Sequence, residues 1–260
     1  MKQRLHLIAA FCMVIGLFAG IGGAAANGDD GCAALPDYAT LRDALKAAQA
    51  DDNGGFALNM WATIVDRDGV VCAVAFTGES RGDQWPGSRV ISAQKANAAN
   101  AFSLPGLALS TANLYSATQP GGSLYGLQHS NPVDTRAAYR GNPVHYGAPN
   151  DPMVGDRIGG VNVFGGGLAM YSGERKVVGA LGVSGDTSCA DHNIGWRLRN
   201  RLNFDFLQSV GGVSGDAARP DNIIFDVTPN PDGGTGKSAG GFGHPTCINT
   251  GDPALLPVVK

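Results

Sequence analysis

Two cysteine–histidine pairs are the residues of this chain best suited to chemistry. Cys189 and His192 are separated by two residues, and His244 and Cys247 have the same spacing in the reverse order. Thiolates and imidazoles are the ligands that zinc prefers, and imidazole is also a frequent axial ligand of haem iron. On a helix, Cys189 and His192 would lie one turn apart on one face. A bond between Cys189 and Cys247 would bring both histidines into one neighbourhood.

Three interpretations of this cysteine–histidine group stay open. In the first, Cys189 and Cys247 form a plain disulfide, and the histidines bind nothing. In the second, the disulfide positions His192, His244 or both to ligate haem iron. In the third, all four side chains bind zinc, because two cysteines and two histidines suit tetrahedral coordination. A disulfide and a zinc–thiolate site exclude each other, so the oxidation state of the cysteines separates the third interpretation from the others.

A second group of candidate ligands lies in a proline-rich stretch at about 104–157 that has little periodicity. It contains His129, His145 and Tyr125, together with further tyrosines at positions 115, 139 and 146. Histidine and tyrosine both ligate haem iron, and aromatic rings line many ligand pockets. The alternative is a loop packed by its own aromatic side chains. We hypothesise that some of these residues line a pocket.

Two charged residues complete the candidate set. Lys95 lies in an alanine-rich segment that reads as a helix, where it would either pair with a carboxylate such as a haem propionate or extend to solvent. Asp191 is expected to cap or begin the helix that starts near Cys189. Such a capping role needs no catalytic function.

Other patterns are incomplete and exclude several classes of protein. The glycine-rich stretch at 233–238 resembles the end of a phosphate-binding loop, but Pro231 stands where that motif needs glycine. The second glycine of Gly182-Val-Ser-Gly185 comes one residue too early for a hydrolase nucleophile elbow. With a net charge of −3, the short basic run at 197–201 reads as a solvated helix face. We therefore expect no ATPase, no hydrolase and no nucleic-acid partner.

Residues 1–26 are typical of a secretory signal peptide. Lys2 and Arg4 precede a mostly apolar stretch at 5–21, and alanines at 24–26 provide a cleavage site. An uncleaved anchor is the alternative. No later segment is apolar enough to span a bilayer, so we expect a secreted or periplasmic protein without stable membrane insertion.

Four cysteines remain after the expected cleavage, and an exported chain normally oxidises them. Four cysteines allow three pairings. We favour Cys32–Cys72, which would tie the mature N-terminus to an early strand, and Cys189–Cys247, which would staple the C-terminal tail to the core. The expected compartment also favours the plain disulfide among the three interpretations above.

These side chains must be positioned by a small set of regular elements. Apolar periodicity predicts helices at 35–49, 88–102 and 189–210. Two hairpins are predicted, one with strands at 59–65 and 70–76 around an Asp-Gly turn, the other with strands at 160–171 and 176–183. A short strand candidate follows at 223–225. The order helix, hairpin, helix, hairpin, helix indicates the α+β class, with an antiparallel sheet flanked by helices.

We expect residues 27–260 to form one domain, with a long loop insertion at about 104–157 and a loop-rich C-terminal extension at about 211–260. About 230 residues suffice for one sizeable core.

Four sequence stretches carry a family resemblance. They are Trp-Ala-Thr-Ile-Val-Asp-Arg-Asp-Gly at 61–69, Ala-Gln-Lys-Ala-Asn-Ala-Ala-Asn-Ala-Phe at 93–102, Gly-Gly-Val at 159–161, and Val-Gly-Ala-Leu-Gly-Val-Ser-Gly at 178–185 with Asp191 after it. Together they resemble the GlcG/HbpS-like haem-binding family, whose fold is profilin-like. The resemblance implies an antiparallel sheet flanked by helices, frequent homo-oligomers, and haem binding in some members. Simple members lack the four mature cysteines, the insertion and the tail. Because the iron ligands differ among members, the resemblance assigns no iron ligand in this chain.

The expected function is therefore non-covalent haem binding outside the cytoplasm, for storage, transport or sensing. One alternative is a haem-degrading or redox enzyme built on the same pocket. Another is a cofactor-free accessory module that uses the insertion to hold a partner. Haem is the expected cofactor and small-molecule ligand, with zinc as the less favoured choice.

Overall fold

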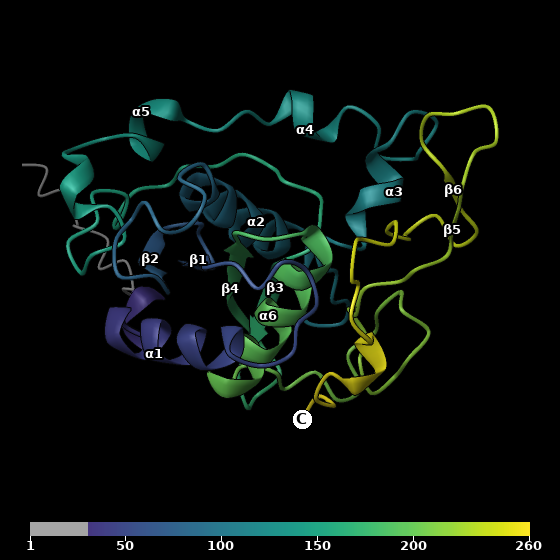
Figure 1. Cartoon of the computed structure of the whole chain (residues 1–260). Coiled ribbons are helices and arrows are strands. Elements are labelled where there is room, and N and C mark those ends of the chain that lie inside the picture. The colour runs from purple at the N-terminus through teal and green to yellow at the C-terminus, as the bar shows by residue number, and fades with distance from the viewer. Residues whose placement is uncertain (1–30) are drawn as a thin grey trace, which may run out of the picture.

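A four-stranded antiparallel sheet forms the centre of the protein (Figure 1). The computed structural model describes residues 31–260, so the expected signal peptide at 1–26 lies outside the described residues. The strands are β1 (Trp61–Asp66), β2 (Val71–Phe76), β3 (Gly167–Tyr171) and β4 (Val177–Ser184), arranged in the order β2-β1-β4-β3. The three long helices are α1 (Tyr38–Gln49), α2 (Ser88–Phe102) and α6 (Ser188–Arg201). The predicted order of elements and the α+β class are confirmed.

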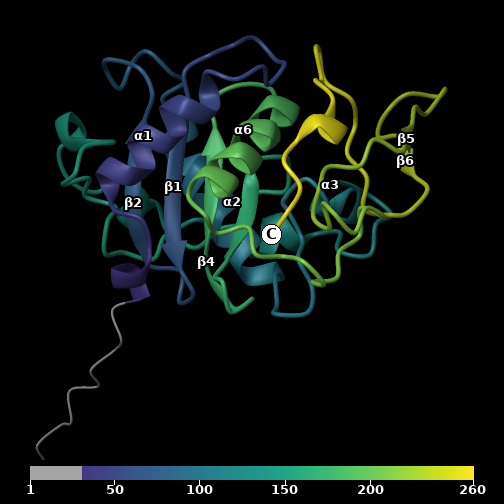
Figure 2. The same ribbon diagram turned by 90° about the horizontal axis from the view of Figure 1, so that it is seen from below.

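Helices cover both faces of this sheet. Figure 2 shows α1 and α6 side by side in front of the strands, with α2 behind them. Alternate side chains of β1 serve the two faces: Ala62 and Ile64 pack with α1 and α6, whereas Trp61 and Val65 pack with α2. All six residues of β1 are therefore buried, as expected for a strand with helices on both sides.

The first hairpin forms around the predicted Asp-Gly turn. Asp66 Oδ1 accepts hydrogen bonds from the backbone N–H of Asp68 at 2.9 Å and of Val70 at 2.8 Å. Gly69 has φ +78°, a left-handed conformation that a side chain disfavours. Local turn chemistry thus sets the register of β1 and β2.

Small residues let α2 lie close against the sheet. A Cβ added to Gly182 would meet the carbonyl oxygen of Ser92 and the backbone nitrogen of Ala96. One added to Gly167 would meet the Lys95 carbonyl oxygen and the Thr111 methyl group. Gly167 of β3 and Gly182 of β4 thus face the alanine-rich side of α2, and a larger side chain would push the layers apart.

Two predicted elements extend too far, and one predicted strand does not form. Helix α6 ends at Arg201 and not at 210, because Asn203 has φ +62°, a left-handed conformation that an α-helix cannot continue through. The strand predicted from residue 160 begins at Gly167, after Gly159, Gly160 and Gly166 take positive φ. The stretch at 223–225 is not a strand; the short tail strands are β5 (Val227–Thr228) and β6 (Lys237–Ser238).

The proline-rich insertion is ordered and docked on α2. It contains three short helices, α3 (Leu114–Thr118), α4 (Leu127–Ser130) and α5 (Thr135–Ala138), which Figure 1 shows along one edge of the molecule. Arg89 of α2 forms a buried ion pair with Asp151 and donates a 2.7 Å hydrogen bond to the Ala138 carbonyl. Its guanidinium also lies 3.7 Å from the centre of the Tyr146 ring. One buried cation therefore anchors several points of a segment that has no sequence periodicity.

The tail is held by side chains of α6. Arg199 pairs with Asp221 at 2.6 Å, and neither side chain is exposed, so this part of the basic run is not the solvated face that we expected. Trp196 donates its ring N–H to the Pro257 carbonyl at 2.9 Å. Short 3-10 turns at Gly31–Ala34, Pro143–His145 and Pro253–Leu255 complete the described elements. Across residues 31–260, no helix combines the length and the apolarity that a membrane crossing requires.

Candidate functional site

A glycine-containing corner between β4 and α6 organises the candidate site. Gly185 has φ +156°, and a Cβ there would meet the Asn59 carbonyl oxygen. The next residue, Asp186, accepts hydrogen bonds from the backbone N–H of Phe56 and of Leu58 at 2.9–3.0 Å. Thr187 caps helix α6 by accepting the N–H of Ala190. The corner thus fixes where the first turn of α6 places its side chains.

The four described cysteines form two disulfides. Cys32 is bonded to Cys72, and Cys189 is bonded to Cys247. These are the two pairs that we favoured from the sequence. The second one joins the first turn of α6 to the tail across 58 residues of sequence.

Lys95 and Asp191 form a buried ion pair next to this disulfide. The Lys95 Nζ lies 2.6 Å from Asp191 Oδ2 and donates to the Val183 carbonyl at 3.0 Å. It also lies 4.3 Å from the centre of the Phe164 ring. Burial lowers the pKa of Lys95 and raises the pKa of Asp191 to about 6, although the opposite charge of each partner resists both shifts.

This pair decides between the alternatives that were open for both residues. Lys95 does not extend to solvent; it pairs with a carboxylate, which belongs to the protein itself. Asp191 lies in the first turn of α6 and does not cap the helix; its Oδ1 accepts the backbone N–H of Asp186. The pair therefore joins α2 to α6 and closes the corner.

His192 is buried among protein groups. Its Nε2 lies 3.2 Å from Asn222 Oδ1 and receives the backbone N–H of Ile223 at 3.2 Å. Within the described part of the chain, its Nδ1 has no hydrogen-bond partner. Burial lowers the pKa of His192 to about 3, so the ring is neutral at neutral pH.

His244 combines burial with a free ring nitrogen. It is only 1% exposed and packs against Tyr115, with ring centres 5.0 Å apart. Its Nδ1 lies 2.7 Å from the Pro245 carbonyl, a contact in which Nδ1 donates the proton. The Nε2 therefore carries a lone pair and has no partner among residues 31–260. Burial lowers the pKa of His244 to about 4, which keeps this lone pair unprotonated at neutral pH.

The remaining predicted ligands lie apart from this buried group. Tyr125, His129 and His145 are all exposed on the insertion, and His145 contacts only the Asn150 amide among described side chains, at 3.1 Å. The structure thus separates the predicted site residues into a buried group around α6 and a surface group on the insertion.

The predicted four-ligand zinc set is not assembled. A ring nitrogen of His244 and the sulfur atoms of Cys189 and Cys247 lie within 4.8 Å of one another, whereas His192 is not part of this group. Because His192 faces Asn222 and the backbone of Ile223, its nitrogen is directed elsewhere. The sulfur atoms are bonded to each other, so they offer no thiolates in this state.

A large open cavity lies beside His244. It has a volume of about 1000 Å³ and is formed by Ser116 and residues 119–123 of the insertion together with residues 228–231 and 235–242 of the tail. We call it the tail cavity. At one end of the cavity, Ser116 Oγ donates to the Gly243 carbonyl at 2.6 Å. The next residues along the two segments are Tyr115 and His244, whose rings pack against each other. Lys237 is the only charged side chain in the cavity lining.

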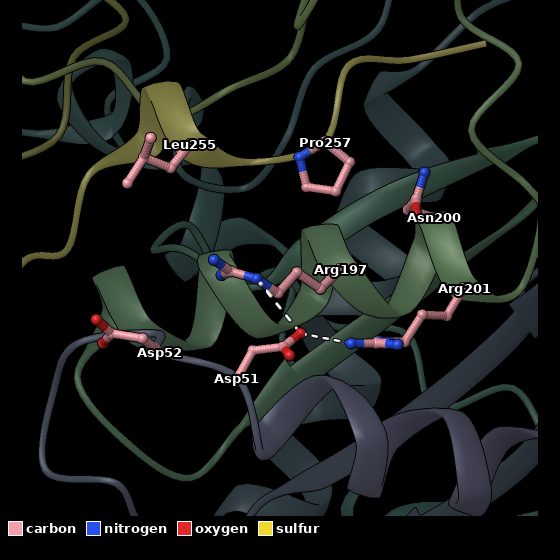
Figure 3. Close-up of a pocket in the computed structure, with 7 residues that line it drawn as sticks. All are labelled: Asp51, Asp52, Arg197, Asn200, Arg201, Leu255 and Pro257. Carbon is pink, nitrogen blue, oxygen red and sulfur yellow. Dashed lines mark hydrogen bonds and ion pairs between the residues drawn. The ribbon is translucent and has the colours of Figure 1, made fainter.

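A second cavity, of about 410 Å³, lies between α1, α6 and the end of the tail (Figure 3). Its charges are already compensated: Asp51 Oδ2 lies 2.6 Å from Arg201 and 3.5 Å from Arg197. The side chain of Asp52 also lines it, and the lining includes none of the predicted site residues. This cavity therefore presents two carboxylates and two guanidinium groups, whereas the tail cavity presents the single cation of Lys237.

Sequence reasoning missed several residues that shape the site. Asn222 and Phe164 have no motif around them, Lys237 lies in the incomplete phosphate-loop pattern at 233–238, and each contacts or faces residues far away in the sequence. The clearest available signal was the glycine-rich character of the tail between 233 and 243, which indicates backbone close to a ligand or to another segment.

Most of the chain matches a known protein family. The sequence model of the family described as "Haem degrading protein HbpS-like" matches residues 38–197, which include the whole sheet and most of the three long helices. No curated protein is similar to the chain by sequence.

The chain is also similar to two solved structures. One is the crystal structure of the Klebsiella pneumoniae protein ORFY, assigned to family DUF336, with 24% identity, a TM-score of 0.43, and coverage of 64% of this chain and 90% of that one. The other is the crystal structure of a PduOC–haem complex, with 21% identity, a TM-score of 0.44, and coverage of 64% and 91%.

Proposed function

Because the chain belongs to the HbpS-like family, whose members are described as haem-degrading proteins, we propose that it binds haem. Binding is non-covalent and serves storage, transport or sensing. The family match carries this proposal, and the free Nε2 of His244 beside the tail cavity supports a specific place for the ligand.

The tail cavity has the size and the chemistry for such a ligand. Small-molecule pockets in proteins measure about 300–1000 Å³, and this cavity measures about 1000 Å³. Phe242 supplies an aromatic face, and Lys237 supplies a cation for a propionate. The glycines of the lining let backbone approach a flat ring closely.

His244 is the proposed axial ligand. The carbonyl of Pro245 holds the proton on Nδ1, which leaves Nε2 with its lone pair. The pKa of about 4 keeps the imidazole neutral, as iron ligation requires. The side chain is 1% exposed, so haem would bind it only after the groups that cover it move. The adjacent Gly243 is held by the Ser116 hydroxyl, which donates to its carbonyl, and by Ser238 Oγ, which accepts its N–H at 3.0 Å.

The other candidate ligands are weaker for stated reasons. His192 is enclosed by Asn222 and Ile223, and Lys95 is neutralised by Asp191. His129 and His145 remain alternatives on the surface, and neither of the two cavities described above includes them.

Titration of the oxidised protein with haemin tests the proposal. We expect a shifted Soret band at saturation, and its loss in His244→Ala. A His129→Ala, His145→Ala double variant is the matched control and should retain the band, since both residues lie outside the tail cavity. Circular dichroism confirms that each variant is folded. Absence of any haemin uptake would overturn the proposal, and loss of the band only in the double variant would move the ligand to the insertion.

Degradation of haem is the second candidate function, favoured by the family description. Incubation of the haem complex with ascorbate and oxygen separates the two functions. A Soret band that is stable for hours indicates a binding protein, whereas steady bleaching with release of iron indicates an enzyme.

Export is part of the proposed function. Two disulfides are typical of proteins that fold in oxidising compartments, which supports a secreted or periplasmic location. Mass measurement of the protein isolated from its native compartment should give an N-terminus at Asn27. An intact residue 1 in the cytoplasmic fraction would contradict export.

A further inference from the structure

Cys189, Cys247 and His244 form a group that could bind a metal ion in the absence of haem. Its two sulfur atoms and one imidazole nitrogen lie within 4.8 Å of one another. We propose that reduction of the Cys189–Cys247 disulfide converts this group into a zinc site with three protein ligands. The disulfide therefore acts as a redox gate on metal binding.

The first support is the unsatisfied imidazole. His244 is 1% exposed, and its Nε2 lacks a hydrogen-bond partner anywhere in the described chain. A buried polar atom without a partner costs about 1–3 kcal/mol. Coordination of a metal ion through Nε2 would remove this cost, and the hydrogen bond from Nδ1 to the Pro245 carbonyl is of the kind that the second nitrogen of metal-bound histidines makes.

The second support is the setting of Cys247. Its Sγ accepts the backbone N–H of Cys189 at 3.3 Å and lies 3.6 Å from the Ser188 hydroxyl. Both donors belong to the first turn of the 14-residue helix α6. A helix N-terminus and direct N–H donors stabilise a thiolate, which is the form of cysteine that binds metals. Released Cys247 would therefore meet donors already in place.

Charge and geometry suit zinc. Two thiolates and a neutral imidazole balance a doubly charged ion, and the nearby cation Lys95 is neutralised by Asp191 at 2.6 Å. The Cα atoms of the two cysteines are 6.1 Å apart, so rotation of the side chains alone can separate the sulfur atoms. Three protein ligands leave the fourth tetrahedral position for water or another small ligand.

The chemistry balances with a dithiol as the reductant. A thiolate of the dithiol attacks one sulfur of the protein disulfide, and its second thiol then resolves the mixed disulfide. Two electrons and two protons pass to Cys189 and Cys247, and the dithiol becomes a cyclic disulfide. Zinc binding then releases the two thiol protons to solvent.

The second disulfide provides an internal control. Cys32, Cys72 and Asp66 also bring their ligand atoms within 4.8 Å of one another. However, Asp66 Oδ1 already accepts the N–H groups of Asp68 and Val70 in the hairpin turn. This group has no imidazole, so it should bind zinc more weakly than the group around His244.

The test measures zinc on the haem-free protein, before and after reduction with dithiothreitol and anaerobic desalting. We expect a single tightly bound zinc ion per chain in the reduced protein and none in the oxidised protein. Cys32→Ser, Cys72→Ser should keep this behaviour, whereas Cys189→Ser, Cys247→Ser should abolish it. His244→Gln should weaken zinc binding by at least about tenfold, and it keeps the test decisive if the double cysteine variant does not fold.

Cobalt gives a spectroscopic readout of the same site. The reduced protein should show a sulfur-to-cobalt charge-transfer band, which should disappear in Cys189→Ser, Cys247→Ser, and intense visible bands of tetrahedral cobalt, which should shift in His244→Gln with the lost nitrogen. Equal zinc content in oxidised and reduced protein, or zinc retained by Cys189→Ser, Cys247→Ser, would overturn the proposal. Since haem is absent throughout, a negative result here leaves the haemin titration of the oxidised protein unaffected.

Discussion

The Lys95 Nζ lies 2.6 Å from Asp191 Oδ2, and solvent reaches neither charge. Lys95 comes from α2 on one face of the sheet, and Asp191 comes from α6 on the other. The same ammonium group donates to the Val183 carbonyl of β4 at 3.0 Å. One buried ion pair thus connects all three layers at the corner where the candidate site begins.

Removal of one partner of this pair should be costly. In Asp191→Asn the Lys95 charge stays buried without its counter-charge, and we expect a loss of about 3–5 kcal/mol in the free energy of unfolding. The double variant Lys95→Met, Asp191→Leu should lose much less, because it buries no charge. Urea denaturation of both variants checks this, and a single-variant loss below about 1 kcal/mol would contradict a tight pair.

Acidification should destabilise the protein through His192. Its pKa is about 3 in the folded state against 6.5 for a free histidine, so below pH 6.5 the unfolded chain takes up a proton that the folded chain refuses. This stability is complete above pH 6.5 and is lost progressively down to about pH 3. Between pH 7 and pH 5 the loss amounts to about 2 kcal/mol.

Asp191 acts in the opposite direction over part of that range. Its pKa of about 6 is above the ordinary 3.8, so between these values the folded protein binds the extra proton and gains stability as the pH falls. The contribution of His192 is therefore isolated by comparing the wild type with His192→Gln. Unfolding curves at pH 7 and pH 5 should differ less in the variant, and equal differences in the two proteins would contradict a buried neutral His192.

The Cys189–Cys247 disulfide should dominate the stability of the tail. It closes 58 residues, for which the chain-entropy model gives about 4 kcal/mol. We expect Cys189→Ser, Cys247→Ser to lower the free energy of unfolding by roughly this amount, and limited proteolysis to cut the tail first. Resistance of the tail equal to that of the wild type would mean that Arg199–Asp221 and Trp196–Pro257 hold it without the crosslink.

Gly182 should not tolerate a side chain. The Cβ of Gly182→Ala would meet the backbone of α2 at Ser92 and Ala96, and we expect a cost of about 1–3 kcal/mol from this overpacking. Gly106→Ala is the matched control, since nothing lies within 4 Å of its added Cβ. Thermal unfolding should give a lower midpoint for Gly182→Ala than for Gly106→Ala. Equal midpoints would show that α2 can shift away from β4.

Local chemistry explains which features were predictable. The Asp-Gly turn after Asp66 and the alanines of α2 specify elements through interactions within a few residues. The even number of cysteines after residue 26 made two disulfides expected, and the family resemblance of the stretches around 61–69 and 178–185 is confirmed by the family match over 38–197.

The ends of elements were less predictable because single backbone angles decide them. Asn203 stops α6 by taking φ +62°, although the apolar pattern continues to Leu207. A periodic apolar pattern does not indicate that one residue adopts a left-handed backbone conformation, since asparagine is also found within helices.

The sequence by itself determined the order of helices and strands, the two-faced burial of the sheet and the pool of candidate ligands. Only the tertiary structure decided which candidates meet: Lys95 finds Asp191 across 96 positions, Arg89 orders the insertion through Asp151, and His244 is left with a free nitrogen beside a cavity while His192 is enclosed. The physical reason is that periodicity and turn residues act over a few positions, whereas a buried charge or imidazole is satisfied by whatever group the packed chain brings within about 3 Å of it.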